Sequence, residues 1–446
     1  MEYRAFSGMS IGELCGKEHP CACGKTHAVS TLKAYPEGSS VQQLLASIHE
    51  LLPSGSVLFV TDEDVYELYA RKFEKMIART HSVTLLLYPK SFLPSVSACS
   101  QAVSAGEEHR LIVSYGGAGV TDAAKYAAEI RGLPLVSMGS SPSADSYLAP
   151  YSELYFGKVK KRVASRPPAY FIWDTEAVAT APASDAAAGF GTVCAKSVAL
   201  FDLGAAQALS GEPLCENICA LLENCVSSVL NISSGLQRGN REALAELCRN
   251  LMRCGLAAQL CGGDSLYGGE TQLALTCEML MRSEGLAVRQ SGENLMLCAE
   301  LAARMYKLYF ETSPPDLFVP PDTAAHARML AGLFGLSERP FLEAALGAAN
   351  DGELLVHKLS EYRADFRSQS LALAERMHGA LMQFKKLYAD AGYWIRSYLP
   401  SSVPARAAVL GPLLFGRYTL LLALRGMGCL ELPEAEAAPS AESGKA

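Results

Sequence analysis

The sequence has no excess of positive charge and no long uninterrupted hydrophobic run. Its 39 Lys and Arg residues against 46 Asp and Glu give a net charge of −7, and binding to a phosphate backbone needs clustered basic side chains, so we expect no nucleic-acid partner. The apolar runs Val83–Tyr88 and Ala407–Leu424 are short or interrupted by Gly, Pro and Arg, so we expect no membrane segment. The first residues lack the basic-then-apolar layout of a signal peptide, which favours a cytoplasmic location.

Histidine is scarce in the chain. There are eight histidines, and none lies between His109 and His326, so the central part of the sequence offers no imidazole to a metal ion. Cysteine is more frequent, with 14 residues. In a reducing compartment a disulfide framework is not expected. Several cysteines recur at helical spacing and are expected to pack as small buried hydrophobes, namely Cys215, Cys219, Cys248, Cys254 and Cys261.

The first part of the chain alternates between strand and helix patterns. A length of 446 residues favours two domains, because one hydrophobic core rarely serves a chain of this size. The alternation predicts βαβ units, hence an α/β domain with a mostly parallel sheet whose ligands lie at the carboxyl ends of the strands. The predicted strands are Ser56–Thr61, Ser82–Tyr88, Arg110–Ser114 and Leu133–Met138, and the predicted helices are Tyr66–Ala78, Val96–Gly106 and Thr121–Arg131.

From about Pro182 the pattern becomes helical throughout. Apolar residues recur at three- and four-residue spacing with no strand pattern between them, which predicts an all-α domain. The predicted helices are Ala186–Leu209, Glu212–Ile232, Arg241–Gln259, Thr271–Ser283, Asn294–Phe310, Asp322–Leu336, Gly352–Ala391 and Ala405–Arg425, with a proline-rich loop at Ser313–Asp322. We therefore expect domains at 1–182 and 183–430, followed by a tail over 431–446 whose Glu, Ala, Ser and Pro content is typical of disorder.

A glycine-rich turn over Tyr115–Lys125 joins the third predicted strand to a helix. Small residues let the backbone approach a pyrophosphate, and the N–H groups at the start of a helix face its charge. Such turns are also common without a ligand, so the motif alone leaves both interpretations open. A second polar turn, Gly139–Tyr147, follows the fourth strand and offers hydroxyls and one carboxylate to the same crevice.

An ordered series of motifs resembles the iron-containing alcohol dehydrogenase and dehydroquinate synthase-like superfamily, and within it the sn-glycerol-1-phosphate dehydrogenase branch. Residues 116–126 (GGAGVTDAAKY) resemble the superfamily's Gly-Gly-Gly-Ser-x-x-Asp-x-x-Lys signature, and residues 143–147 (SADSY) resemble the branch's Ser-x-Asp-Gly-Tyr. The stretch 173–191 and the early segment 21–27 (CACGKTH) match two further motifs of the branch. The resemblance covers roughly residues 15–310, which makes it more specific than any one glycine motif.

This resemblance implies a Rossmann-like N-terminal domain, a helical C-terminal domain and a cleft between them, where NAD or NADP binds. It places Gly116, Gly117 and Gly119 near the phosphates, and Asp122 and Lys125 beside the nicotinamide. Ser140 and Ser141 would replace the usual Thr-containing cofactor contacts, and Asp145 would face the substrate. The family reaction is reversible hydride transfer between nicotinamide and glycerone phosphate. After the first strand, Asp62, Glu63 and Asp64 make a 2′-phosphate less favourable.

The sequence departs from the family at the residues that bind its divalent metal. The family uses one Asp and two His, and the metal polarises the carbonyl as a Lewis acid. Thr192 stands where the Asp is expected, Asn294 where the first His is expected, and Cys298 where a further His is frequent. At the position of the second His the chain has only the Pro314–Pro321 loop. A hydroxyl and an amide are poor substitutes for carboxylate and imidazole, so we expect the cleft metal to be absent.

Two further observations concern His326 as a replacement metal ligand and substitutions within the glycine turn. His326 lies in a predicted helix, which favours a packing role over metal binding. Within the glycine turn, Ala118 stands where Gly is usual and Gly119 where Ser or Thr is usual, and Gly139 replaces a Pro before the paired hydroxyls. A methyl group at a close-approach position weakens pyrophosphate binding.

A cysteine and histidine cluster near the N-terminus, Cys15, His19, Cys21, Cys23 and His27, has enough ligands for a structural zinc. Its Cys-x-Cys spacing is tighter than that of common zinc sites, and no second pair is nearby, so cytosolic cysteines in a turn are the favoured interpretation. The basic run Lys158–Arg162 has two interpretations as well, a substrate-phosphate site or an exposed sheet edge that carries lysines.

Two functions of different class follow from these residues. The first is an NAD(P)-dependent oxidoreductase that acts on a small molecule, a phosphorylated one by resemblance, without the family's metal. Asp145, Lys125 and Tyr147 are the candidates for proton transfer and charge stabilisation in it. The second is an inactive paralogue that keeps the fold and binds nucleotide as a sensor or scaffold. The sequence leaves a homo-oligomer open as an assembly state.

Overall fold

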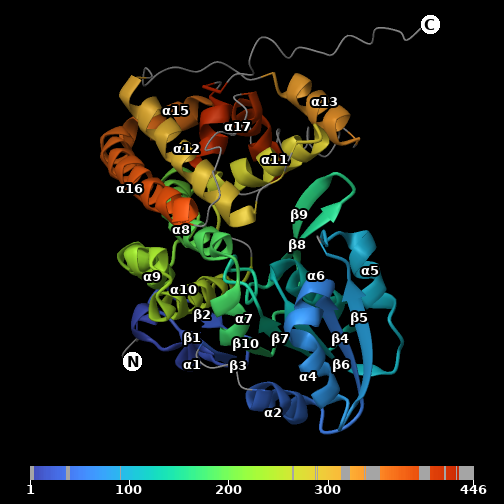
Figure 1. Cartoon of the computed structure of the whole chain (residues 1–446). Coiled ribbons are helices and arrows are strands. Elements are labelled where there is room, and N and C mark those ends of the chain that lie inside the picture. Colours follow the sequence, from blue (N-terminus) through green and yellow to red (C-terminus); the bar gives the residue numbers. More distant parts are fainter. Residues whose placement is uncertain are drawn as a thin grey trace, which may run out of the picture.

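The computed structural model describes residues 5–430 apart from residues 37–40, 91, 264–265, 287, 289, 313–321, 336, 338–351, 391–401, 416–417 and 428. It confirms the predicted fold class. A parallel-sheet α/β part is followed by a helical part, most of which lies above it in Figure 1. The predicted tail at 431–446 and nearly all of the predicted loop at 313–322 lie outside the described residues.

The main sheet has six strands in the order β3-β10-β7-β6-β4-β5, and every neighbouring pair is parallel. The four strands predicted from the sequence form its centre and one edge. The prediction missed β3 and β10, which are three and four residues long and too short for a periodic pattern. The strands are β3 (Lys33–Tyr35), β4 (Ser56–Asp62), β5 (Ser82–Tyr88), β6 (His109–Gly116), β7 (Leu135–Gly139) and β10 (Tyr170–Trp173).

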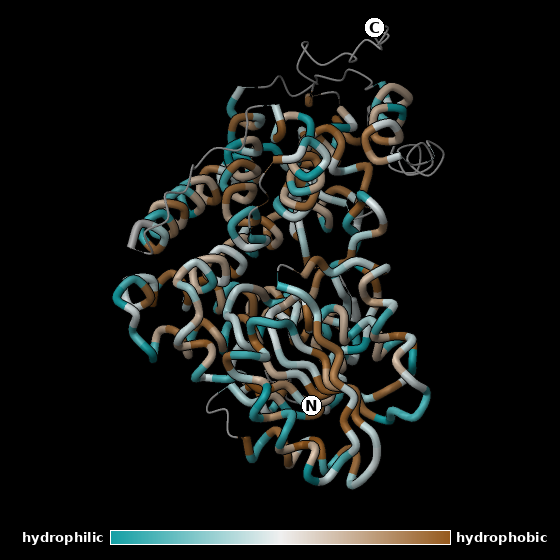
Figure 2. Tube along the Cα trace, turned by 45° about the vertical axis from the view of Figure 1, so that its right-hand side comes forward, coloured by the Kyte–Doolittle hydropathy of each residue, from teal (hydrophilic) through white to brown (hydrophobic). Residues whose placement is uncertain are grey.

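The sheet is apolar on both faces because helices cover both. Val57 and Phe59 of β4 share one cluster with Leu44 of α2 (Val41–Leu51) and with α4 (Arg71–Ile77). Leu58 and Val60, which alternate with them, share another cluster with α5 (Val96–Ser104) and the alanines of α6 (Ala118–Arg131). Figure 2 shows these strands as hydrophobic segments in the middle of the α/β part. Continuous apolar strands of this kind are typical of parallel sheets.

The register brings the two polar turns together. Gly116 at the end of β6 is paired with Gly139 at the end of β7, and Trp173 of β10 is paired with the same glycine. Because parallel strands end at one edge of the sheet, the glycine turn and the Gly139–Tyr147 turn leave it side by side. The backbone N–H of Ser140 donates to the carbonyl of Gly116, which ties the two turns directly.

The helical part begins with the long buried helix α8 (Ala183–Ser210). No strand is assigned after it in the part of the chain that the structure describes. The predicted helix at 352–391 is two helices, as is the one at 405–425. The further bounds are α9 (Glu216–Gln237), α10 (Arg241–Leu260), α11 (Gly269–Ser283), α12 (Ser291–Thr312), α13 (Thr323–Phe334), α15 (Gly352–Glu361), α16 (Arg363–Asp390), α17 (Ser402–Leu414) and α18 (Leu420–Gly426).

Helix α8 is the one described helix long and apolar enough to cross a membrane, but 89% of its most apolar window is buried inside the protein. Its apolar surface is therefore used for packing, as in the core helix of a globular domain. It contacts α9, α12 and α16.

Helices α8 and α12 cross in close contact. A Cβ atom added at Gly292 would lie 2.0 Å from the carbonyl oxygen of Ala188, and one added at Gly191 would lie 2.5 Å from the carbonyl oxygen of Gly292. At Gly189 an added Cβ would lie 2.0 Å from the carbonyl oxygen of Pro142 in the second polar turn. These glycines let two helices and a loop of the other domain meet backbone to backbone.

Asp202 of α8 holds the starts of two helices. Its carboxylate accepts hydrogen bonds from the backbone N–H groups of Gly269, at 2.6 Å, and Leu420, at 2.7 Å, and from the hydroxyl of Tyr306. Burial raises the pKa of Asp202 to about 7, although these hydrogen bonds act in the opposite direction. As the pH rises, the carboxyl group of Asp202 therefore loses its proton at lower pH in the unfolded chain than in the native state.

This raised pKa predicts a pH-dependent effect of Asp202→Asn. The stabilisation that comes from protonated Asp202 is full below the unfolded pKa, near 4, and is lost as the pH rises through about 7. The variant does not titrate at this position. We therefore expect the difference in unfolding free energy between wild type and variant to fall between about pH 5 and about pH 8, by at least about 1.4 kcal/mol, the equivalent of one pKa unit. Denaturant titrations at both pH values measure it, and a difference that stays constant or grows contradicts the assignment.

Candidate functional site

A cavity of about 710 Å³ lies where the carboxyl edge of the sheet meets the helical part. This volume falls within the range of small-molecule sites. The hairpin of β8 (Tyr151–Phe156) and β9 (Val159–Ala164) forms one wall and rises towards α11 (Figure 1). Its polar and charged lining includes Asp122, Asp145, Glu153, Lys160, Arg162, Thr192, Lys196, Glu278, Arg282 and Asn294.

The glycine turn forms the start of α6 at one end of the cavity. Gly116 needs to be glycine, because an added Cβ would lie 2.9 Å from the side chain of Val120. Gly117 is the N-cap residue, with no side-chain cap on the helix and open space where its Cβ would be. Gly119 lines the cavity and faces Pro94 of the loop after β5. The first backbone N–H groups of α6 therefore face space that an anion can enter.

Asp122 lines the cavity, whereas Lys125 is fully buried behind it. The ammonium of Lys125 lies 2.9 Å from the carboxylate of Asp122 and donates to the carbonyls of Ser146, at 2.6 Å, and Tyr151. Burial raises the pKa of Asp122 even though Lys125 opposes the shift. The donors of Lys125 are directed at the loop between β7 and β8, so its geometry suits holding that loop rather than exchanging protons with a ligand.

Ser140, Ser141 and Tyr147 of the second polar turn lie outside the cavity lining, whereas Ser143 and Ser146 of the same turn are part of it. Ser140 is buried, and the hydroxyl of Ser141 donates to Asp185, at 2.6 Å. The hydroxyl of Tyr147 donates to the carbonyl of Ser141, at 2.7 Å, and its ring packs on Trp173. Burial raises the pKa of Tyr147 well above its usual value. The geometry therefore gives Tyr147 a place in the core, beneath the turn.

Asp145 lines the cavity and forms an ion pair that could not be foreseen from the sequence. Its carboxylate lies 2.8 Å from the ammonium of Lys196 on α8, and both side chains are about nine-tenths buried. Burial acts to lower the pKa of Lys196, but the charge of Asp145 outweighs it and raises the pKa. Lys196 therefore stays protonated in the cavity wall. It lies one helical turn after Thr192, on the same face of α8.

Of the residues at the expected metal positions, Thr192 and Asn294 line the cavity. The hydroxyl of Thr192 donates to the carbonyl of Ala188, at 3.0 Å. Asn294, in the first turn of α12, is buried, and neither polar atom of its side chain has a hydrogen-bond partner among the described residues. Cys298 is buried and lies outside the cavity lining. His326 packs in α13 beside Arg425, 3.1 Å away, and burial, then the charge of Arg425, lowers its pKa.

The basic run belongs partly to the cavity. In β9 the side chains alternate, so that Lys160 and Arg162 face inward while Lys161 is exposed, and Lys158, in the turn before β9, is exposed as well. Lys160 pairs with Glu278, at 3.0 Å, and with Glu153, at 3.2 Å. Burial acts to raise the pKa of Glu153, but Lys160 and Arg162 outweigh it and lower the pKa to about 2. The phosphate-site and exposed-edge interpretations thus each fit half of the run.

Arg282 is a second cavity residue that the sequence motifs do not reveal. It lines the cavity mouth from the last turn of α11, is exposed, and has its guanidinium 5.0 Å from the centroid of the Tyr155 ring. Unlike Lys160 and Lys196, it has no carboxylate partner within the described ranges. Lys196 could have been found from its spacing to Thr192, whereas nothing in the spacing of Arg282 points to the cavity.

Several known proteins are similar to part of this chain. Residues 38–182 match the family model described as iron-containing alcohol dehydrogenase. A glycerol-1-phosphate dehydrogenase [NAD(P)+] from Hyperthermus butylicus is 28% identical over 49% of this chain and 63% of its own length. One from Methanospirillum hungatei is 23% identical over 66% of this chain and 83% of its own length. The part of the chain over residues 38–182 is thus similar to the iron-containing alcohol dehydrogenases, and a longer stretch is similar to proteins named glycerol-1-phosphate dehydrogenase.

A solved structure shows that this fold occurs in a known protein. The solved structure of a 1,3-propanediol oxidoreductase is similar with a TM-score of 0.57 at 15% identity, over 88% of this chain and 96% of that one. The alignment with the Hyperthermus butylicus relative spans less than two thirds of that protein. The predicted resemblance to this superfamily is confirmed by the family model over residues 38–182 and by the curated relatives.

Proposed function

We propose that the chain is an NAD(P)-dependent oxidoreductase that reduces the carbonyl of a small anionic compound, of which glycerone phosphate is the first candidate, without a divalent metal. The observation that carries the proposal is the Lys196–Asp145 ion pair in the cavity wall, one helical turn from Thr192. The ammonium of Lys196 supplies a fixed positive charge in the region where the superfamily uses a metal ion. The names of the two curated relatives support the substrate and cofactor classes.

The start of α6 fits a dinucleotide. Its N-terminal N–H groups have no side-chain cap, and the space next to Gly117 is open, as a pyrophosphate requires. A nicotinamide bound beyond it, near Asp122, would supply the hydride. The acids after β4 argue for NAD over NADP, since Asp62 caps α3 (Glu63–Val65) and keeps a carboxylate at the carboxyl end of that strand.

A divalent metal does not fit the residues at the end of the cavity opposite the start of α6. Thr192 and Asn294 offer a neutral hydroxyl and amide, while zinc and iron prefer thiolate, imidazole and carboxylate. The ammonium of Lys196 lies on the same face of α8 as Thr192 and is paired with Asp145. Asp145 already neutralises that ammonium, so its carboxylate is not free to hold a metal.

Lys196 can act on the substrate oxygen directly. Its ammonium donates a hydrogen bond to the carbonyl, which stabilises the negative charge that develops as hydride reaches the carbon. The C=O π pair moves to the oxygen, and Lys196 transfers one proton to it, giving the alcohol. Solvent then returns a proton to the amine, and Asp145 favours that return because it raises the pKa of Lys196.

Binding and turnover test the proposal together. Calorimetric titration with NADH and NADPH is expected to show binding, and an absorbance assay with glycerone phosphate is expected to show oxidation of the cofactor. Added Zn²⁺, Ni²⁺, Mn²⁺ or Fe²⁺ is expected to leave the rate unchanged. Strong activation by one of these ions contradicts the metal-free proposal, and absence of dinucleotide binding contradicts the cofactor.

A second candidate function is an inactive paralogue that binds nucleotide as a sensor or scaffold. The pairing of Lys160 and Arg162 with Glu153 and Glu278 favours it, because those charges are already satisfied within the cavity wall. Tight dinucleotide binding with no turnover of glycerone phosphate or of other small carbonyl compounds would select this function over the enzyme.

Arg282→Ala is expected to weaken the binding of a phosphorylated substrate selectively. A charge-assisted hydrogen bond contributes about 1.5–3 kcal/mol, and each 1.4 kcal/mol is about tenfold, so KM for glycerone phosphate should rise about 10- to 100-fold with little change in kcat. Lys158→Ala, an exposed change in the turn of the β8–β9 hairpin outside the cavity, is the matched control. Equal effects of the two substitutions, or none from Arg282→Ala, contradict phosphate recognition at the mouth.

A further inference from the structure

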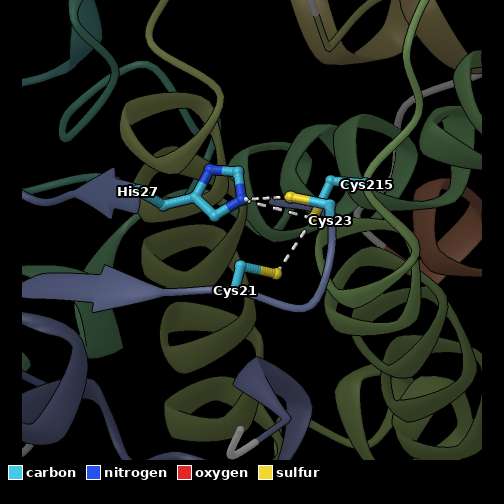
Figure 3. A group of neighbouring side chains, drawn as sticks. All are labelled: Cys21, Cys23, His27 and Cys215. Atoms are coloured by element: carbon cyan, nitrogen blue, oxygen red, sulfur yellow. Dashed lines mark hydrogen bonds between the residues drawn. The ribbon is translucent and has the colours of Figure 1, made fainter. Parts of the chain in front are cut away.

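The fold brings a fourth ligand to the N-terminal cysteines. Cys21 and Cys23 lie in the turn of the β1 (Glu18–Pro20) and β2 (Thr26–Ala28) hairpin, and His27 lies on β2. Cys215, the N-cap residue of α9, comes from 188 positions further along the chain and faces them (Figure 3). One ligand atom from each of the four residues lies within 4.8 Å of the others.

The distances match a tetrahedral site. With bonds of about 2.3 Å to sulfur and about 2.0–2.1 Å to nitrogen, neighbouring ligand atoms of tetrahedral zinc are about 3.5–3.8 Å apart. Here Cys21 Sγ and Cys215 Sγ are 3.7 Å apart, Cys215 Sγ and His27 Nε2 are 3.4 Å apart, and Cys23 Sγ and His27 Nε2 are 3.2 Å apart. Three of the six distances between ligand atoms are therefore already close to those of a tetrahedral site, and all six are within 4.8 Å.

The surroundings orient these ligands. His27 Nδ1 lies 2.6 Å from the carbonyl oxygen of Leu260, and a proton on Nδ1 leaves the Nε2 lone pair directed at the sulfurs. The amide of Asn217 donates to Cys21 Sγ, at 3.1 Å. Metal-bound histidines almost always donate their other N–H in this way, and N–H groups that donate to a thiolate offset its charge.

We propose that the chain binds one structural Zn²⁺ through Cys21, Cys23, His27 and Cys215. Three thiolates and one imidazole form a closed set that leaves no position for a substrate. None of the four residues lines the cavity described above, so this ion is separate from the cleft. This proposal replaces the interpretation favoured by the sequence, in which the N-terminal cysteines lie in a turn without zinc. The spacing of the motif gave no sign that Cys215 is the fourth ligand. Cys15 and His19 are not ligands: His19 faces the carbonyl of Leu14, at 3.0 Å, and Cys15 lies outside the group.

The ion would fasten the N-terminal hairpin to the helical part. Cys215 fixes the hairpin turn to the start of α9, and His27 fixes β2 to the end of α10 through Leu260. Directly after β2, Ser30 and Thr31 contact Gln259, and the chain then enters the edge strand β3. Zinc binding therefore contributes to the position of the sheet relative to the helices.

A disulfide between Cys21 and Cys215 is the competing state. Its S–S bond would be about 2.05 Å, whereas the two sulfurs are 3.7 Å apart. It would also leave Cys23 and His27 facing a neutral bond with no role for either. Free thiols in the purified chain distinguish the two states.

Elemental analysis of the full chain, purified without a polyhistidine tag in the presence of a thiol reductant, tests the proposal. We expect about one zinc per chain in the wild type, and loss of that zinc in Cys215→Ser and Cys23→Ser. Cys219→Ser is the matched control, because Cys219 lines the same surface hollow but is not part of the group, and it should keep the zinc. Cobalt in place of zinc should give the intense visible bands of tetrahedral thiolate coordination.

A measurement on the wild type covers the case in which the serine variants fail to fold. A mercurial that blocks thiolates, added with a metallochromic dye, should release about one zinc per chain. Wild-type protein without zinc, zinc that persists in folded Cys215→Ser, or a Cys21–Cys215 disulfide in fresh protein found by mass spectrometry each overturns the proposal.

Discussion

Lys196→Met is expected to lower kcat for carbonyl reduction by about 10²–10³-fold, the effect of removing one preorganised donor to a developing oxyanion. The substitution keeps the length of the side chain and removes its charge. It also leaves Asp145 buried without its partner, and breaking a buried pair in this way costs about 3–5 kcal/mol of stability. Steady-state kinetics and denaturant unfolding measure the two effects separately.

The double variant Lys196→Met with Asp145→Asn separates catalysis from stability. It removes both charges, so most of the lost stability should return, because replacing a whole buried pair is often near neutral. Turnover should stay low, because the donor to the substrate oxygen is still missing. A double variant with wild-type kcat would show that Lys196 is not the charge that replaces the metal.

Gly292→Ala is expected to destabilise the fold strongly although it adds only one methyl group. The new Cβ would lie 2.0 Å from the carbonyl oxygen of Ala188 and 2.7 Å from the hydroxyl of Thr192. Backbone atoms cannot rotate away, so α12 must move off α8. Overpacking of this kind costs about 1–3 kcal/mol and sometimes more, and we expect a value at the upper end or above it. Denaturant unfolding measures it.

Gly204→Ala on the same helix α8 is the matched control for this prediction. An added Cβ meets nothing within 4 Å there, and alanine replaces glycine in a helix with a gain of about 0.5–1 kcal/mol. The two substitutions should therefore have opposite signs. If Gly292→Ala were as harmless as Gly204→Ala, this would contradict the close contact between α8 and α12 that brings Asn294 to the cavity wall.

Much of the fold could be predicted because its elements are long and regular. The apolar runs of β4 and β6 are buried on both faces, and helices such as α8 and α10 repeat apolar residues over many turns. The short strands β3 and β10 could not be predicted, because they are held by pairing with β7 and with each other rather than by their own pattern.

The site was harder to predict because its groups come together only in the folded chain. The glycine turn could be placed from sequence, since β6, Gly117 and α6 are contiguous. The burial of Lys125 follows from the alanines around it, Ala123 and Ala128 among them, which pack α6 tightly on the sheet. Arg282 meets the β8–β9 hairpin, and Cys215 meets His27, only through tertiary contacts.

The metal content of the Cys215→Ser chain tests most directly whether the cleft holds no divalent metal and uses Lys196 in its place. The folded variant would be incubated with excess Zn²⁺, Ni²⁺ or Fe²⁺, desalted and analysed by mass spectrometry of the elements. We predict no bound metal, because the substitution removes the proposed zinc site and Thr192 and Asn294 cannot form another. About one ion per chain that disappears on Thr192→Ala or Asn294→Ala would contradict a metal-free cleft.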